Sequence, residues 1–590
     1  MEADEDPPTL QSKCFQIVRE HFSALDRRVL LDLPVPVLTD LLPHLTACQL
    51  DELQPALNLR GISTISGWKA ILQEDLGPTR VRDLHTEEEA KRKAMAWLFR
   101  LVFYGFRSRY VQRNLRNLDT VDFLSAAARC VRQFVVVPRK YESLQSLAAD
   151  RRKVLDLLEQ NVTSVSVTQS EDPRGEKTRA ALYVLHRLLD HGRATELVLS
   201  TQWSLGLAWM LRGRGTGFSD NSDDSDQRPC KRSKLDPPDP CDAPTVGPCP
   251  RGQIGSLVVN MCDSDSLRVL NRALPTFFSL RSLSLQSVDV LSDSQVLDLS
   301  RALQQLSLSS RSSLSRLSVQ VLPRTGLLGT LLDSTPGLTS LRVCIRSETP
   351  GTSRPSPTEA SSSRLPLREL SIQVSEPRTD PVLISSLLRR CPDLQNLHLE
   401  RMRSGTSQDQ LLRTLTDWNV HSLRTLVLED LKLSDCVPHI IRLLRSCRLE
   451  ELRLTDCRLL EACEDREDRL RQLVSAAKAV PTLKVLGLAQ NRLAKSVCVL
   501  AELFSGRPAG CIQHLDISSN FIQAAELLEL ARRLRTRPPA RLPTLDLRKN
   551  PGDRDPESWG AALKALRPFA SPLSDGWKSA GAMLDHVSNM

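Results

Sequence analysis

Aromatic side chains are scarce in this sequence: they make up 4% of its 590 residues, although 41% of the residues are hydrophobic. An interior built from aliphatic side chains suits stacked repeats, in which every layer has a similar thickness. No apolar run approaches the roughly 18 residues that cross a bilayer. The first ten residues are acidic, carry Pro7 and Pro8, and do not resemble a signal peptide, so we expect no membrane contact.

Residue patterns typical of catalysis are also missing. The sequence has no GxxxxGK(S/T) phosphate loop, no GxSxG nucleophile elbow, no HExxH zinc motif and no CxxC pair. Its 15 cysteines lack paired spacing, and no histidine lies near Cys230, Cys241 or Cys249. We therefore predict reduced thiols, no metal, no cofactor and no enzymatic activity.

Charge is nearly balanced, with 79 basic and 70 acidic side chains and a net charge of +9. The arginines are scattered over expected helix surfaces, whereas nucleic-acid-binding proteins gather their basic residues on one face. We therefore predict no nucleic-acid partner.

A leucine frame repeats along the chain. The block Leu449–Leu459 reads LEELRLTDCRL, which is LxxLxLxxCxL with strand-like alternation at its centre. The clear copies begin at Leu394, Leu423, Leu449, Leu483, Ile512 and Leu542, and weaker ones at Leu280, Leu314, Leu338 and Leu367. The clear copies begin 26 to 34 residues apart, which leaves room for a helix in each repeat, such as Ala524 to Leu534.

This period predicts an α/β fold, a leucine-rich-repeat horseshoe of the ribonuclease-inhibitor type. The asparagine or cysteine of the frame stands where the chain leaves the strand, and we expect its side chain to bind buried backbone groups along the stack. The residues between the buried leucines are expected to face solvent and to identify no partner by themselves; examples are Arg453, Thr455, Lys484 and Gly487.

Composition divides the chain into four parts: a small all-helical module (1–150), degenerate repeats (151–211), a linker (212–252) and the main repeat domain (253–590). The degenerate repeats are seen in Val162–Val167 and Ala194–Leu199. The linker is rich in Pro, Ser and Asp and is predicted to be disordered. It holds Lys231, Arg232 and Lys234, the minimal pattern of a nuclear import signal, although short basic clusters also arise by chance.

The helix predicted after Pro8, with Thr9 as its N-cap, carries one apolar stripe. Its members are Leu10, Cys14, Ile17, Val18 and Phe22. The spacing of Thr9-Leu10, Cys14 and Val18 resembles the BC box, the helix by which SOCS-box-like proteins dock on Elongin C. This is a helix-in-groove contact, with Leu10 as the anchor. A stripe of this kind is also typical of ordinary core packing.

A second element, Leu33-Pro34-Val35-Pro36, begins fifteen residues after Val18 and resembles the L-P-Φ-P form of the cullin box. Two such boxes in this order before a repeat array favour a ligase receptor. Two alternatives remain. The proline at 34 fits the first turn of a core helix. The leucines at 38, 41 and 42 make the segment similar to the start of an F-box, which docks on Skp-type adaptors.

With both boxes and the repeats, the chain resembles the Elongin BC-box leucine-rich-repeat proteins. The resemblance also runs through 483–504, 515–520 and the C-terminal 573–590, extends over most of the chain, and is weakest around 212–252. It implies a non-catalytic substrate receptor of a cullin–RING ubiquitin ligase, found in the nucleus and the cytoplasm.

The resemblance also implies partners for the two boxes. Elongin C, with Elongin B, would bind Leu10, Cys14, Ile17 and Val18. A cullin of the fifth or second class, with a RING protein, would bind Leu33, Pro34, Val35 and Pro36. A protein substrate would bind the repeats. The alternatives are an F-box-like receptor on a Skp-type adaptor and a stand-alone leucine-rich-repeat scaffold or inhibitor.

Overall fold

A computed structural model describes most of the chain. The described residues are 10–77, 81, 84–137, 140–168, 176–200, 204–212, 214, 253–287, 289–346, 364–374, 381–401, 407–417, 422–461, 465–505, 511–539 and 541–574. The chain divides into two compact units, Met1–Asn260 and Met261–Met590. No described helix combines the length and the apolar composition needed to cross a bilayer.

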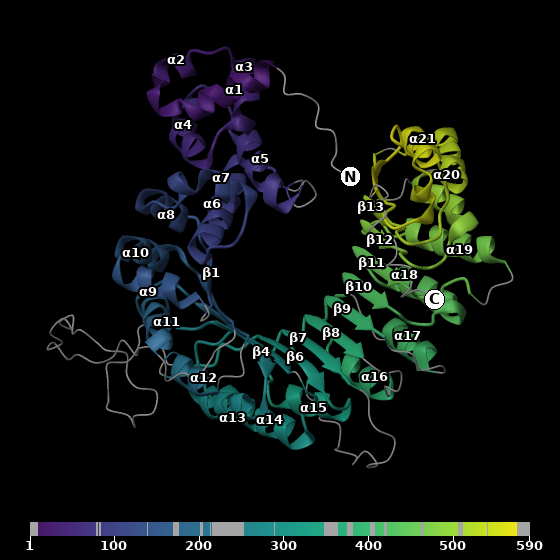
Figure 1. The fold of residues 1–590 in the computed structure, drawn as a ribbon. Coiled ribbons are helices and arrows are strands. Elements are labelled where there is room, and N and C mark those ends of the chain that lie inside the picture. The colour runs from purple at the N-terminus through teal and green to yellow at the C-terminus, as the bar shows by residue number, and fades with distance from the viewer. Residues whose placement is uncertain are drawn as a thin grey trace. The chain divides into compact units, whose positions relative to one another are not determined.

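The first unit begins with helices and continues with strands that alternate with helices (Figure 1). Its helical part comprises α1 (Leu10–Glu20), η1 (Phe22–Ala24), α2 (Arg27–Leu31), α3 (Val35–Leu41), η2 (Leu42–His44), α4 (Ala47–Leu59), α5 (Ile65–Leu76), α6 (Glu87–Tyr104), α7 (Arg109–Leu118) and α8 (Val121–Ala128). Its second part comprises β1 (Gln133–Val136), α9 (Tyr141–Ala149), α10 (Arg152–Asn161), β2 (Ser164–Thr168), α11 (Glu176–His186), the π-helical turn η5 (Arg187–His191), β3 (Glu196–Ser200), α12 (Ser204–Leu211) and β4 (Ser256–Cys262).

Capping residues explain where several of these helices begin. Thr46, Thr86, Ser108 and Thr120 each accept a hydrogen bond from the backbone N–H three residues on, which satisfies a donor that the helix leaves unpaired. The helices bury large side chains against one another, and Trp68 and Phe99 are the largest of them. The helical part therefore has an interior of its own.

The second unit is a regular alternation of strand and helix. Its elements are α13 (Ser264–Ala273), η6 (Leu274–Thr276), β5 (Ser282–Ser287), α14 (Asp293–Ser307), β6 (Arg316–Leu322), α15 (Gly326–Asp333), β7 (Ser340–Ile345), β8 (Glu369–Val374), α16 (Pro381–Arg389), β9 (Asn396–Glu400), α17 (Ser407–Asp417), β10 (Thr425–Glu429), η7 (Ser434–Cys436), α18 (Val437–Ser446), β11 (Glu451–Thr455), α19 (Arg466–Lys478), β12 (Val485–Gly487), η8 (Ala494–Phe504), β13 (His514–Asp516), α20 (Ala524–Thr536), β14 (Thr544–Asp546), η9 (Pro551–Arg554), α21 (Pro556–Leu566) and β15 (Ser571–Leu573).

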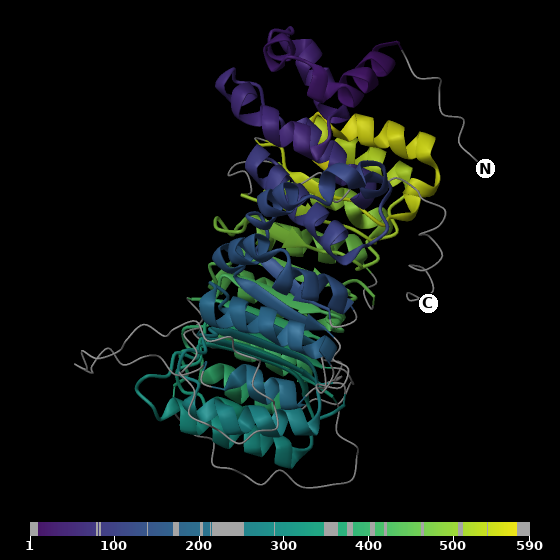
Figure 2. The ribbon, with the colours of Figure 1, turned by 60° about the vertical axis from the view of Figure 1, so that its left-hand side comes forward.

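All paired strands are parallel, and strands that are neighbours in sequence pair with each other within each unit. In β10, Leu426 and Leu428 are buried under the helices, in register with Leu452 and Leu454 of β11. The residues between them lie on the opposite side of the sheet, which we call the helix-free face. Figure 2 shows the repeats of the second unit as successive layers, from teal to yellow. The predicted α/β leucine-rich-repeat fold is therefore confirmed.

Asparagines connect successive repeats of the second unit. Asn520 is fully buried; its Oδ1 accepts from Asn491 N at 2.9 Å, and its own N–H donates to Asn550 Oδ1 at 2.8 Å. Asn491 Oδ1 accepts in the same way from Cys457 N at 3.1 Å. We call Cys457, Asn491, Asn520 and Asn550 the asparagine ladder. It confirms that the side chain at this place of the frame binds buried backbone groups.

The structure also shows strands that the leucine frame did not predict. β1 lies inside the stretch expected to be all-helical, with Phe134 buried in register with Val165 of β2. β4 follows the predicted linker and pairs with β3. Both carry the frame with other apolar residues in place of most or all leucines: Val131, Phe134 and Val136 are buried at β1, and Ile254, Leu257 and Val259 are buried at β4. The repeats therefore begin earlier than the frame indicated.

The described cysteines form no disulfide, and several are buried small side chains of the repeats. Burial raises the pKa of Cys262 and of Cys391 to about 12, so neither is a reactive thiolate at neutral pH. Cys262 and Cys391 are therefore small packing residues of the repeats.

Candidate partner-binding surfaces

One face of α1 attaches it to the rest of the helical part. Phe15 is buried, and its ring centroid lies 5.3 Å from that of His44. Arg19, one turn further, donates to Asn114 Oδ1 at 2.9 Å. Phe22 lies beyond α1 in η1 and is also buried. Phe22 therefore belongs to the packed face, which corrects its expected place on the apolar stripe.

Another face of α1 leaves apolar side chains in solvent. Ile17 is 57% exposed, Cys14 is exposed, and Val18 is half-buried at the edge of this face. The helix begins at Leu10, which shares a side of α1 with Cys14 and Ile17 by its spacing; the Leu10 side chain and Thr9 lie outside the described part. We call Leu10, Cys14, Ile17 and Val18 the α1 stripe. Cys14 and Ile17 are therefore not part of the core formed by the described residues.

The segment Leu33-Pro34-Val35-Pro36 lies at the start of α3. Pro34 is the N-cap, and Pro36 stands in the first turn. Pro34, Val35 and Pro36 are exposed and Leu33 is half-buried, whereas the buried residues of α3 are Leu38 and Leu41. The segment does start a helix, and its prolines are accessible to a partner at the same time. Both interpretations of the segment are compatible with this placement.

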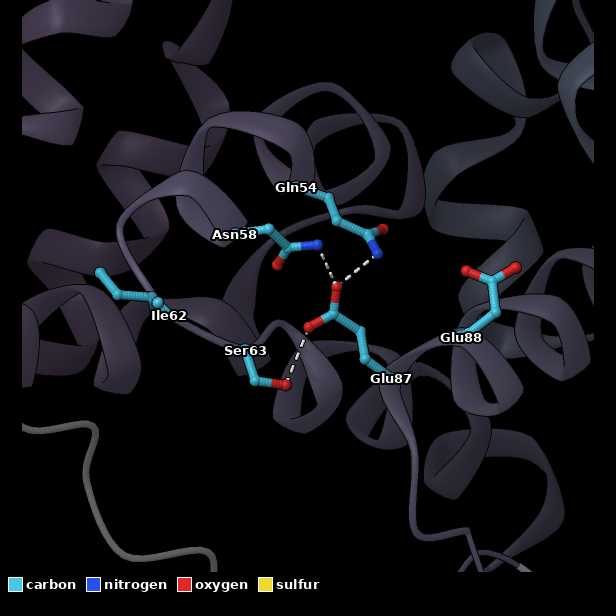
Figure 3. A pocket seen from close by; sticks show the side chains of 7 residues that line it. Gln54, Asn58, Ile62, Ser63, Glu87 and Glu88 are labelled. Atoms are coloured by element: carbon cyan, nitrogen blue, oxygen red, sulfur yellow. Dashed lines mark hydrogen bonds between the residues drawn. The ribbon is translucent and has the colours of Figure 1, made fainter.

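Glu87 joins α6 to the connection between α4 and α5. Figure 3 shows its carboxylate facing Gln54, Asn58 and Ser63, and it accepts from Asn58 Nδ2 at 2.9 Å, Ser63 Oγ at 2.8 Å and Thr64 N at 2.7 Å. Desolvation raises the pKa of Glu87, but these bonds and one from Gln54 outweigh it and hold the pKa below its ordinary value. The open pocket here, of about 390 Å³, is therefore lined by groups that already bind one another.

The helix-free face of the second unit carries a cross-strand contact at its centre. Arg453 of β11 lies over Gly487 of β12: a Cβ at Gly487 would come within 2.9 Å of Arg453 Cγ. The guanidinium pairs with Glu451 and reaches to 3.7 Å from Asp516 Oδ2 on β13. Gly487 is therefore buried under Arg453, which corrects the expectation that it faces solvent.

One group of side chains in the described part of the chain has the geometry to hold a metal ion. His398, Glu400 and Glu429 lie on the helix-free face of β9 and β10, with ligand atoms within 4.8 Å of one another. Glu400 already accepts from Gln373 Nε2 at 3.0 Å and pairs with Arg401 at 3.3 Å. A hydrogen bond from His398 lowers the pKa of Glu429. The group is thus a polar network held by the protein's own donors.

A buried ion pair lies in the first unit, where the sequence suggested only a linker. Arg214 is 3% exposed, and its Nε donates to Asp190 Oδ1 at 2.6 Å. Asp190 belongs to the π-helical turn η5 and also contacts His186 Nδ1 at 2.5 Å. The carbonyl of Arg214 accepts from Ile254 N at 3.2 Å, so the two ends of the predicted linker meet. Arg214 is packed, and its position in a glycine-rich stretch concealed this.

The structure describes two of the three predicted sites and not the third. The α1 stripe and Leu33–Pro36 lie in the same helical part, on separate segments. The basic cluster Lys231, Arg232 and Lys234 lies outside the described residues.

Part of the chain is similar to known leucine-rich-repeat proteins. No protein-family model matches it. It is 33% identical over 211 residues to leucine-rich repeat-containing protein 41 of Homo sapiens, of Rattus norvegicus and of Mus musculus. The match covers 35% of this chain, less than the expected extent of the resemblance, and the chain spans about a quarter (26%) of the length of these relatives.

A search of solved structures finds a chain from the crystal structure of the Rad7 and Elc1 complex in yeast. It covers 85% of this chain and 92% of the other, with 14% sequence identity and a TM-score of 0.34. A likeness of this size carries no argument about function.

Proposed function

We propose that the chain is the substrate-recognition subunit of an Elongin BC–cullin–RING ubiquitin ligase. In this role it supplies no catalytic group. Its helical part docks on Elongin C, and its repeats hold a protein substrate near a ubiquitin-charged enzyme, which raises the effective concentration of the acceptor lysine. The proposal agrees with the similarity to leucine-rich repeat-containing protein 41.

The exposure of Cys14 and Ile17 within the α1 stripe is the observation that carries this proposal. Ile17 is 57% exposed beside the exposed Cys14 and the half-buried Val18, and adjacent exposed apolar residues mark interaction sites. Apolar residues spaced i, i+4 and i+7 on one helix are what a hydrophobic groove recognises. Phe15 and Arg19 fix the helix by its other face, so the stripe is presented on a positioned helix.

Leu10→Ala with Cys14→Ala is expected to abolish co-purification of Elongin C, and Ile17→Asp to do the same. Losing an apolar anchor at the centre of an interface commonly costs about 2 kcal/mol, or roughly 30-fold in affinity. The measurement is the recovery of Elongin C on the tagged full chain, with thermal unfolding of each variant recorded in parallel.

Gln16→Ala is the matched control, because Gln16 is exposed on α1 outside the stripe. It should leave Elongin C recovery unchanged. Full recovery with folded stripe variants would reject the docking assignment. Recovery of a Skp-type adaptor instead of Elongin C would favour an F-box-like receptor, and recovery of no adaptor would favour a stand-alone scaffold.

For the second contact, we propose that Leu33, Pro34, Val35 and Pro36 bind the cullin, which belongs to the fifth or second class. Exposure of the two prolines and of Val35 supports this. Proline fixes φ near −65°, so the segment would lose little entropy on docking. The buried residues of α3, Leu38 and Leu41, lie further along the helix.

Pro34→Ala with Pro36→Ala is expected to reduce cullin recovery severalfold while Elongin C recovery stays at the wild-type level. The contacts lie on separate segments, so their losses should be nearly independent. Both partners are quantified from the same pull-down. Parallel changes in the two, or no change in either, would contradict a cullin box here.

The nuclear and cytoplasmic distribution is proposed on the sequence pattern alone. Lys231, Arg232 and Lys234 would bind an import receptor, and an exposed extended segment is what such a receptor requires.

A further inference from the structure

Four arginines stand on neighbouring strands β5 to β8 of the second unit. Arg281 precedes β5, Arg316 begins β6, Arg342 lies in β7 and Arg368 precedes β8; all four are exposed. We call them the arginine row. Among the described residues none of the four forms an ion pair, and Glu369 is the one acidic residue in these strands.

The cations of the following strands differ, because they have acidic partners. Arg424 and Lys484 both pair with Glu450, the latter at 3.2 Å, and Arg548 pairs with Asp546. Among the described residues, four arginines without an ion pair therefore lie at β5 to β8. Arg316 and Arg342 lie on the helix-free face, next to the buried Leu317 and Leu341, whereas Arg281 and Arg368 lie at the edge of the sheet where β5 and β8 begin. An anionic partner would gain most electrostatic energy there.

The spacing of the arginine row fits an extended peptide. Neighbouring strands lie about 4.8 Å apart, so four strands span roughly 14 Å, the length of about four residues of extended chain. A guanidinium binds a carboxylate through two parallel hydrogen bonds. Ser318 and Ser340 stand directly beside Arg342 and Arg316 in the register of the strands, Ser284 stands beside Ser318, and these serines can donate to further peptide oxygens.

We propose that the arginine row binds an acidic segment of a protein partner. This rests on the proposed function to the extent that the partner is the substrate, and it gives the substrate class as proteins with a run of Asp or Glu. A single-stranded nucleic acid fits less well, because its bases stack on aromatic side chains and β5 to β8 contain none.

Binding of a fluorescein-labelled decaglutamate peptide to the full chain tests this by fluorescence anisotropy. The triple variant Arg316→Ser, Arg342→Ser and Arg368→Ser is expected to weaken binding on the order of 30-fold, about threefold for each lost pair. The matched control is Arg389→Ser, Arg445→Ser and Arg535→Ser. These arginines are exposed on α16, α18 and the end of α20, and their loss changes the net charge equally. The control should weaken binding less than threefold, and added salt should weaken the wild-type complex.

Equal losses in both triple variants would overturn the proposal, since net charge alone would then explain binding. Absence of wild-type binding would overturn it too, and so would tighter binding of a labelled oligouridylate. Elongin C recovery separates this proposal from the ligase function: the arginine variant should keep Elongin C, and the α1 stripe variants should keep the peptide. If the wild-type chain did not bind Elongin C, the ligase proposal would be wrong, whereas the peptide-binding proposal would not be affected.

Discussion

Replacing Asp190 with asparagine is expected to destabilise the first unit by about 3–5 kcal/mol. Arg214 is 3% exposed and Asp190 is 5% exposed, so the guanidinium would remain in the interior without its counter-charge. Its bonds to the carbonyls of Trp209 and Met210 would persist, but they carry no full negative charge. Urea unfolding of the full chain, with hydrogen exchange of peptides from 186–214, measures the change.

Asp156→Asn is the matched control, because Asp156 pairs with Arg187 at 2.9 Å while its own side chain is 56% exposed. Exposed pairs contribute about 0–1 kcal/mol, so this variant should remain close to the wild type. If both variants unfold at the same urea concentration, the buried pair contributes no more than a surface pair.

The same pair predicts a response to acid. Desolvation raises the pKa of Asp190, but hydrogen bonds from Arg214 and His186 outweigh it and hold the pKa below its ordinary value of 3.8. A carboxyl with a lowered folded pKa stabilises the fold above its ordinary value and loses this contribution as the pH falls through the folded pKa. The first unit should therefore lose stability below about pH 4, and the asparagine variant should lose less.

Asn520→Ala is expected to destabilise the second unit on the order of 4 kcal/mol, because several buried backbone groups lose their partner at once. Asn520 accepts from Asn491 N and Leu493 N, at 2.9 and 3.3 Å. Its Nδ2 donates to Leu488 O at 2.8 Å and to Ser518 O at 3.1 Å. Alanine would remove the partner of Asn491 N, Leu493 N and Leu488 O, whereas Ser518 O would keep its bond from Gln490 N at 3.0 Å. Thermal unfolding and hydrogen exchange of β12 and β13 provide the measurement.

Gln513→Ala removes an exposed carboxamide one residue before β13 and serves as the control. Its cost should lie within about 0.5 kcal/mol. A cost for Asn520→Ala no larger than that of the control would show that the ladder does not stabilise the stack.

Much of the fold was predictable because burial has a period. In most frames a buried aliphatic residue alternates with a polar one, and this alternation locates strands such as β11 and β13. β1 was missed because Val131, Phe134 and Val136 take the places of the leucines in its frame. A frame without leucine became evident only from the burial of Phe134 in register with Val165 of β2.

The candidate site was predictable to a smaller extent. Spacing alone brought Leu10, Cys14 and Ile17 to one side of a helix, but it could not tell whether that side was buried. The sequence did not predict ion pairs between strands. Arg453 and Asp516, for example, are 63 positions apart in sequence and approach each other only across a glycine. The unpaired state of the arginine row likewise depends on which residues the neighbouring strands present.

The hydrogen bond between Arg214 and Ile254 affects how many residues related chains can hold between these two positions. The chain leaves the repeats at Arg214 O and returns at Ile254 N, 3.2 Å away, so residues 215–253 join two points that already touch. The entropic cost of closing a loop grows slowly with its length, by only about 0.6 kcal/mol for each doubling of the number of residues. Insertions and deletions can therefore accumulate between these two residues over evolutionary time, while the same change inside a strand would shift every later side chain to the wrong face.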